Sequence, residues 1–174
     1  MSDEEYSQPL FNALPPAVVA LALAIFGVEV LLALASRGYI GGTEGLGWRM
    51  QAVQEFGFYP PLLPWMIETG TWSLEHLKRF VTYSFVHFGF AHAVFVIVFL
   101  LALGKLVGEF FGNLAVLVLF FACGIFGALV YAGIVGSERP LVGGYPSVYG
   151  LIGAYTFLLW VGHGARGENQ YAAF

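Results

Sequence analysis

Two apolar stretches of this sequence hold the side chains that are best suited to chemistry. The first, RFVTYSFVHFGFAHAVF, contains His87 and His92, and the second, PLVGGYPSVYGLIGAY, places Tyr145 and Ser147 shortly after two glycines. A serine hydroxyl attacks a carbonyl when a base lies within hydrogen-bond reach and donors face the developing oxyanion. The chemistry to test for in this sequence is therefore hydroxyl attack assisted by histidine.

The spacing of the two histidines argues against a metal site. His87 and His92 are five residues apart, which on one helix would separate them by ~140°. Histidine ligands on a helix favour one face, as at i and i+4. His163 lies in a polar, glycine-rich segment and is expected to be solvated. We therefore predict no metal and no cofactor, and hydrogen-bonding roles for His87 and His92 inside the fold.

The composition is that of a membrane protein. Hydrophobic residues make up 59% of the 174 residues and charged residues only 10%, against ~25% charged in soluble domains. The net charge of −4 provides no basic surface for nucleic acid. The single cysteine, Cys123, excludes a disulfide within the chain. The sequence predicts an all-α polytopic membrane protein whose surroundings are the lipid bilayer.

The apolar runs predict four transmembrane helices, because ~20 apolar residues cross the hydrocarbon core. We expect an acidic tail over residues 1–14, then helices over residues 15–36, 74–103, 114–135 and 147–161. Residues 37–73 are rich in glycine, proline and aromatic residues without a run of spanning length. This pattern predicts an embedded or interface-lying loop. Ser73 is a good N-cap for the helix that follows the loop.

Two features inside these helices suggest binding. Glu29 lies in the first helix, where a carboxylate is expensive and marks a functional site by default. The alternatives are a protonated group, a bond to a neighbouring helix, or a bond to water. Gly150, Gly153 and Ala154 lie on one side of the last helix and would let another membrane helix approach closely. The binding candidates are Glu29, His87, His92, Tyr145, Gly150, Gly153 and Ala154.

The two stretches quoted above resemble rhomboid proteins, a family of intramembrane serine proteases and their inactive relatives. RFVTYSFVHFGFAHAVF is similar to the start of the second rhomboid helix, and PLVG followed by YGLIGAY is similar to the start of the fourth. The resemblance covers roughly residues 72–160. It implies a rhomboid-like helical bundle with a membrane-embedded loop after the first helix. Because the family's basic form has six transmembrane helices, we expect residues 15–174 to be a C-terminally incomplete domain that lacks two.

A Trp-Arg pair in the embedded loop is a further mark of the family. Trp48-Arg49 matches this pair by residue type. Alignment through the histidine stretch instead puts Lys78-Arg79 at the pair. The sequence leaves both placements open.

The resemblance also implies that the proteolytic site is degenerate. Rhomboid proteases carry the nucleophile in a Gly-x-Ser-Gly motif before the fourth helix. Here Gly143 takes the first position, Tyr145 the serine position and Pro146 the following glycine position. His92 matches an oxyanion histidine, but Val96 stands where its asparagine partner belongs and cannot donate a hydrogen bond. The base histidine of the sixth helix has no counterpart, so we expect an inactive rhomboid-like protein, a pseudoprotease.

The expected function is to bind transmembrane helices of other membrane proteins or to serve as an accessory subunit of a larger membrane complex. The alternative is an active intramembrane serine endopeptidase with Ser147 as a displaced nucleophile. Two positions along a helix, however, rotate this serine by ~200° from the family's position. A transporter or channel that uses Glu29 is a third hypothesis, which the sequence weakens because it shows no paired intramembrane charges and no inverted repeat.

The charge distribution leaves the topology contested. Rhomboid-like topology puts the amino terminus in the cytoplasm and the loop over residues 37–73 outside. The positive-inside rule prefers the reverse, because most basic residues would then lie outside: Arg37, Arg49, Lys78, Arg79 and Arg139. We expect the family's topology, in a bacterial inner (plasma) membrane, with acidic residues of the loop pairing with its basic ones.

Overall fold

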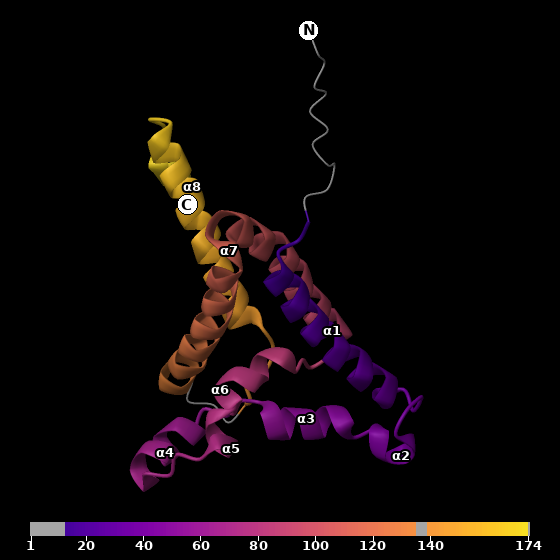
Figure 1. The fold of residues 1–174 in the computed structure, drawn as a ribbon. Coiled ribbons are helices and arrows are strands. Elements are labelled where there is room, and N and C mark those ends of the chain that lie inside the picture. The colour runs from indigo at the N-terminus through magenta and orange to yellow at the C-terminus, as the bar shows by residue number, and fades with distance from the viewer. Residues whose placement is uncertain (1–12, 135–138, 174) are drawn as a thin grey trace.

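The computed structural model describes residues 13–134 and 139–173 (Figure 1). Over these residues the secondary structure is helical, apart from one isolated antiparallel bridge between Phe58 and Leu141. Three of the described helices are long and apolar enough to cross a membrane: α1 (Pro16–Ser36), α7 (Phe90–Ile134) and α8 (Tyr145–Ala165). The shorter elements are α2 (Gly42–Gly45), α3 (Trp48–Phe56), α4 (Leu62–Thr69), α5 (Leu74–Leu77), α6 (Arg79–Thr82), and the 3₁₀ turns η1 (Tyr83–Phe85) and η2 (Gln170–Ala173).

The first helix, α1, matches its predicted range to within one residue, since Pro15 is the N-cap. Pro16 suits the first helical position because the N–H that proline lacks would have no partner there. The N–H of Ala17 is also without a partner inside the helix, and it donates to Asn113 Oδ1 at 3.1 Å. The start of α1 is thereby tied to the bend in α7.

The long helix α7 is broken at Gly112, whose φ of 84° and ψ of 171° are non-helical. Glycine adopts a positive φ readily because it has no Cβ. The break divides α7 into a first arm, residues 90–111, and a second arm, residues 113–134, and the chain reverses direction between them (Figure 1). The sequence predicts that residues 104–113 connect two separate helices, but among them only Gly112 has non-helical backbone angles. Residue 135 of the predicted third helix lies outside the described residues.

Two glycines keep the first arm of α7 close to α1. A Cβ on Gly104 would lie 3.0 Å from Val18 Cγ2, and one on Gly108 would lie 2.6 Å from Pro15 Cγ. Such contacts are shorter than side chains normally make, so small residues are needed at this helix contact. The glycines therefore stay helical and pack, and they do not form a linker.

The predicted helix over residues 74–103 is wrong in its first half. The chain instead forms α5, α6 and η1, becomes extended at Val86 (φ −102°, ψ 133°) and enters α7 only at Phe90. The physical reason is a tertiary bond, because Arg49 Nη1 donates to the His87 carbonyl at 2.8 Å. Since His87 lies outside any helix, the ~140° separation inferred for His87 and His92 is wrong as well.

The loop between α1 and α7 lies across one end of the bundle, with α3, α4 and α5 at a steep angle to the long helices (Figure 1). Ser73 caps α5 as predicted, accepting from the His76 N–H at 3.4 Å. The expected pairing of loop charges holds for Lys78 Nζ, which lies 3.1 Å from Glu55 Oε1. Arg79 Nη1 bonds the carbonyls of Gln54 at 2.7 Å and Gly57 at 3.0 Å. These bonds fasten α3 to the segment that leads into α7.

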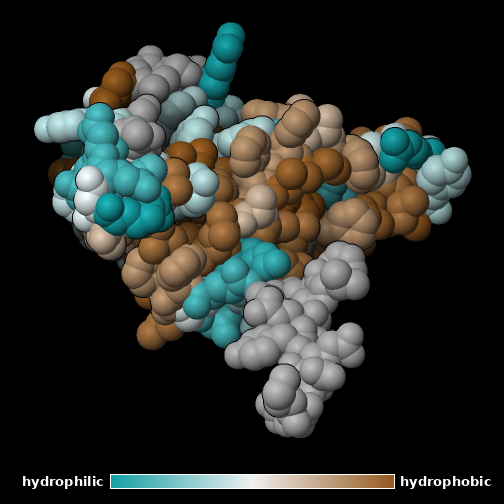
Figure 2. Space-filling model, turned by 90° about the horizontal axis from the view of Figure 1, so that it is seen from above, coloured by the Kyte–Doolittle hydropathy of each residue, from teal (hydrophilic) through white to brown (hydrophobic). Residues whose placement is uncertain are grey.

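The main core lies between α1, both arms of α7 and the first turns of α8. Its fully or nearly buried members include Val18, Ile25, Val96, Leu100, Val107, Phe120, Val148 and Leu151. Large apolar side chains also cover the outside of the molecule, where brown surface occupies much of the view in Figure 2. A core wrapped in an equally apolar exterior is the arrangement that lipid-embedded helices require.

The last long helix, α8, begins two residues before its predicted range of 147–161 and ends four residues after it. Its buried residues are Ser147, Val148 and Leu151, all in the first two turns. Gly150 packs directly against Cys123, while a Cβ on Gly153 would meet open space. Most of α8 therefore projects beyond the rest of the described bundle (Figure 1).

Candidate functional site

The glycine turn before α8 lies against the two histidines. Gly143 has a φ of 95°, and a Cβ there would lie 2.6 Å from His92 Nε2 and 3.2 Å from His87 Cδ2. Its N–H donates to the Tyr83 carbonyl at 2.8 Å. The N–H of Gly144 points to His87 Nε2 at 3.4 Å. Glycine is required at position 143 both for its backbone conformation and for the close approach of the imidazole.

His92 stacks with two aromatic rings. The Tyr145 ring stacks on it with centroids 5.2 Å apart and an interplanar angle of 17°. The Phe88 ring lies on it at 6.3 Å and 22°. The His87 ring meets His92 edge-on at 5.0 Å. The two histidines thus form one cluster with Tyr145, although His87 comes from an extended segment and His92 from the first turn of α7.

His87 is fully buried and is held in its neutral form. Burial, followed by the neighbouring His92, lowers the pKa of His87 to about 4. Because Nε2 accepts from the Gly144 N–H, the proton of the neutral ring belongs on Nδ1. Among the described residues Nδ1 has no hydrogen-bond partner. In this tautomer Nε2 accepts the hydrogen bond from the glycine turn and Nδ1 carries the proton, so neither ring nitrogen is left as a free acceptor.

Glu29 reaches this cluster through Arg49. Arg49 Nη1 and Nη2 bond the two Glu29 oxygens at 2.9 and 2.8 Å, and Nη1 also bonds the His87 carbonyl. Of the alternatives for Glu29, the structure shows the bond to a neighbouring helix, because Arg49 is part of α3. The pairing of Arg49 was missed from the sequence. The available signal was a lone carboxylate in an apolar helix, which needs a cation in reach.

Ser147 faces a different side of the turn. Its side chain is fully buried, and its Oγ donates to the Phe120 carbonyl at 2.7 Å. A Cβ on Gly124 would lie 3.0 Å from this Oγ and 3.4 Å from Ser84 Oγ. Ser147 is therefore directed at the second arm of α7, whereas Tyr145 is directed at His92 on the first.

Val96 occupies the space beside the second glycine of the turn. It is fully buried, and a Cβ on Gly144 would lie 2.9 Å from Val96 Cγ1. A valine provides a methyl group here and no donor. The surroundings of the turn on this side are consequently apolar.

Among the described residues, the N–H groups of the glycine turn donate hydrogen bonds to acceptors within the chain. The N–H groups of Gly143 and Gly144 are directed at Tyr83 and His87, and Pro146 has no N–H. Within the described ranges, the hydroxyl of Ser147 is bonded to a backbone carbonyl and not to a histidine. In those ranges there is also no group of three or more His, Cys, Asp or Glu that could hold a metal ion. These hydrogen bonds hold the start of α8 in place.

The predicted site residues separate into two groups. Glu29, His87, His92 and Tyr145 are brought together through Arg49 and the ring contacts. Gly150, Gly153 and Ala154 lie further along α8, with Gly150 against Cys123, Gly153 open and Ala154 against the core. The second group is a helix surface and does not belong to the histidine cluster.

A protein-family model matches the part of the chain that contains the histidine cluster. No curated protein matches the chain. The family model described as Rhomboid domain matches residues 74–169, which is more than half of the 174 residues and includes the histidine cluster and the glycine turn. With its apolar helices and this match, the chain belongs to the rhomboid family.

Proposed function

We propose that this integral membrane protein is a catalytically inactive rhomboid that binds transmembrane helices of other membrane proteins, as a client-binding protein or as an accessory subunit of a membrane complex. The observation that carries the proposal is the stacking of Tyr145 on His92, with ring centroids 5.2 Å apart. The resemblance to rhomboid proteases puts the nucleophilic serine at position 145. A phenol stands there instead, and it does not replace a serine hydroxyl that a neighbouring base activates.

Three further features oppose catalysis. Val96 provides no hydrogen bond where the family has an asparagine, and loss of one oxyanion donor alone lowers turnover by ~10²–10³. The N–H groups of Gly143 and Gly144 are directed at partners within the chain. Ser147 is bonded to the Phe120 carbonyl, so its activation requires a rearrangement of the start of α8.

The proposal includes four membrane crossings, made by α1, the two arms of α7 and α8. Each arm has 22 residues by its bounds, which at 1.5 Å per residue is ~33 Å and matches the thickness of the hydrocarbon core. We place the amino terminus in the cytoplasm of a bacterium and the loop of α2 to α6 outside. The loop's basic residues have local partners, since Arg49 pairs with Glu29 and Lys78 with Glu55 and Glu75, and this pairing weakens their preference for the cytoplasm.

The surface proposed to bind a partner helix is α8 beyond its second turn. Gly153 has no neighbour within 4 Å of an added Cβ, and it lies with Thr156, Phe157 and Trp160 along a shallow cavity of about 400 Å³. A small residue flanked by aromatic side chains lets a second helix approach and then contact it broadly. The same helix packs tightly at Gly150, so its start is fixed, while the face that carries Gly153 stays open to a partner.

Activity and binding are tested separately. A fluorophosphonate probe should not label the purified full chain, and Ser147→Ala should give the same background. Labelling that disappears in Ser147→Ala would show an active serine and overturn the inactive assignment.

For binding, a photo-crosslinking residue at position 157 should give discrete adducts in native membranes. The same residue at position 23 of α1 serves as the control, because Leu23 is 62% exposed and lies outside α8. Equal adducts at both positions would contradict a specific binding surface on α8.

A further inference from the structure

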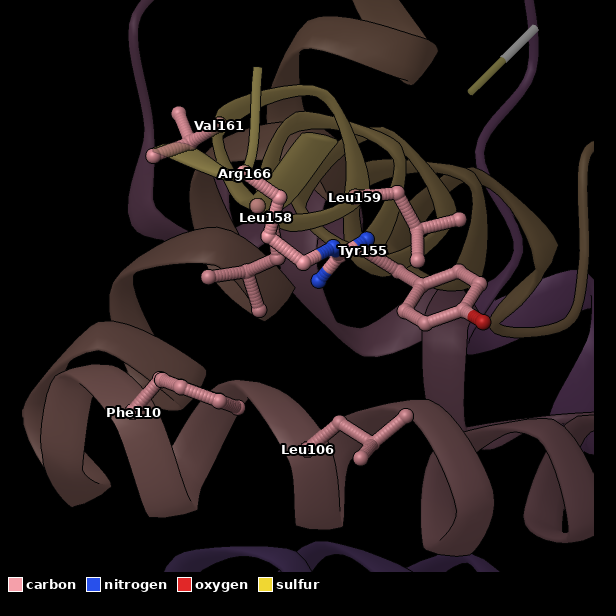
Figure 3. Close-up of a pocket in the computed structure, with 8 residues that line it drawn as sticks. Leu106, Phe110, Tyr155, Leu158, Leu159, Val161 and Arg166 are labelled. Carbon is pink, nitrogen blue, oxygen red and sulfur yellow. The ribbon is translucent and has the colours of Figure 1, made fainter. Parts of the chain in front are cut away.

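We propose that the groove between the first arm of α7 and the carboxyl-terminal half of α8 binds an anionic phospholipid, with one acyl chain in the groove and the phosphate on Arg166. The groove has a volume of about 370 Å³. Leu106 and Phe110 form one wall, Tyr155, Leu158 and Leu159 form the other, and Arg166 lies above them (Figure 3). This site lies apart from the histidine cluster, and the proposal does not depend on whether the protein is inactive; it rests on the proposed topology, which puts this end of the bundle at the cytoplasmic face.

The walls of the groove suit a hydrocarbon chain. Apart from Arg166, the side chains around it are aliphatic or aromatic, and the helix backbone hydrogen-bonds to itself. A cavity of this kind does not hold water well. Lipid tails are as apolar as leucine, however, so the walls alone cannot prefer a bound chain over the surrounding bilayer. Selectivity for one lipid class must therefore come from Arg166.

Among the described residues, only some of the N–H groups of the Arg166 guanidinium have acceptors. Its Nε and Nη2 each lie 2.9 Å from Glu168 Oε2, and Nη2 lies 3.3 Å from His163 Nδ1. No described residue accepts a hydrogen bond from Nη1, and the guanidinium is folded back beside Leu158 and Tyr155 (Figure 3). A planar guanidinium with unused N–H groups above an apolar groove is well suited to bind phosphate oxygens.

The position of the groove along the helices fits a lipid headgroup. Arg166 directly follows the last residue of α8, and Phe110 lies next to the end of the first arm of α7. Both ends lie at the same end of the bundle, opposite the loop of α2 to α6 (Figure 1). Basic pockets between membrane helices at the cytoplasmic boundary bind anionic headgroups. Glu168 opposes such a headgroup, so its removal should strengthen binding while removal of Arg166 weakens it.

The test is native mass spectrometry of the full chain in detergent, with dioleoylphosphatidylglycerol and dioleoylphosphatidylcholine added in equal amounts. The two lipids share their acyl chains and differ in headgroup charge. One cation near the surface favours the anionic lipid about fivefold. We expect this preference in the unchanged protein, its loss in Arg166→Gln and its increase in Glu168→Gln. Leu159→Trp, which fills the groove, should remove the bound lipid of both kinds.

Arg37→Gln is the matched control, because Arg37 also directly follows a long helix, α1, and lies away from the groove. It should leave the lipid preference unchanged. Equal effects of Arg166→Gln and Arg37→Gln, or equal binding of both lipids by the unchanged protein, would overturn the proposal. A dimer mass that falls in Leu159→Trp with no change in bound lipid would also overturn it, since the groove would then hold a second copy of the chain.

Discussion

Arg49 and Glu29 form a bidentate ion pair with N–O distances of 2.8 and 2.9 Å, and the same guanidinium donates a hydrogen bond to the His87 carbonyl at 2.8 Å. The side chain of Glu29 is 1% exposed and that of Arg49 19%. This contact joins α1 and α3 to the extended segment that places His87 against the glycine turn. A buried carboxylate whose only described cation is removed keeps its desolvation penalty without compensation.

Arg49→Met should therefore destabilise the protein by about 3–5 kcal/mol. The measurement is reversible unfolding in mixed micelles, followed by tryptophan fluorescence. Lys78→Met is the control, because Lys78 lies in the loop outside the long helices and pairs with Glu55 at 3.1 Å and Glu75 at 2.9 Å, two side chains that are more than half exposed. Exposed pairs contribute no more than about 1 kcal/mol. Equal losses of unfolding free energy in the two variants would contradict the proposed importance of the buried pair.

The stability should also depend on pH through His87. Burial lowers the pKa of His87 to about 4 in the folded chain, against ~6.5 in an unfolded chain. Between these values the unfolded state binds a proton that the folded state does not, so the unfolding free energy falls as the pH decreases from ~6.5 toward 4, by up to about 3 kcal/mol.

The measurement is an unfolding series from pH 7.5 to 4 on the unchanged protein and on His87→Gln. The variant should be less stable at pH 7.5 and should have a flatter profile. His163→Gln serves as the control, because His163 lies near the end of α8, bonded to Glu168. If His87→Gln kept the full pH dependence, another group would be responsible for it.

The ranges of the long helices were largely predictable, because hydrophobicity over ~20 residues is a local property of the sequence. Prediction failed where a distant residue decided the backbone. Ser73 caps a helix as expected, but the helices that follow it are short, and the chain is extended at Val86, next to the His87 carbonyl that Arg49 binds. The bend was misjudged for a similar reason, since Gly104 and Gly108 are used for contact with α1 and only Gly112 breaks the helix.

The candidate site was predictable in part through the family resemblance. The sequence could pair Gly143 and Tyr145 with the histidine stretch, and the structure places both against His92. It could not show that Arg49 would be the partner of Glu29, since the two residues are 20 positions apart on different helices, α1 and α3. Nor could it show that Ser147 bonds the Phe120 carbonyl, because that bond depends on how α8 packs on the second arm of α7.

Gly143→Ala should be strongly destabilising, whereas Gly153→Ala should not. At a φ of 95° an alanine is strained, at a cost of about 1–2 kcal/mol from the backbone alone. Its Cβ would also lie 2.6 Å from His92 Nε2. Gly153 has a helical backbone and open space around it, so alanine there should stabilise the isolated protein by about 0.5–1 kcal/mol. The melting temperatures of the two variants in detergent should therefore shift in opposite directions. A mild effect of Gly143→Ala would mean that the turn does not rest against His92.

Asn113 lies in α7 but should stabilise the amino end of α1, because it accepts a hydrogen bond from the Ala17 N–H there. Its Oδ1 accepts from the Ala17 N–H at 3.1 Å, although the two residues are 96 positions apart. Asn113→Ala leaves that N–H without a partner and should lower the unfolding free energy by about 1 kcal/mol, as for the loss of a helix cap. Asn113→Asp keeps an acceptor at the amino end of α1 and adds a charge that the helix dipole favours, so it should retain most of the stability.

Hydrogen exchange of the first turn of α1 is the decisive measurement. Faster exchange there in Asn113→Ala, with Asn113→Asp near the unchanged protein, identifies the side-chain acceptor as the cause. If both variants exchanged alike, the bend at Gly112 would hold α1 through packing alone.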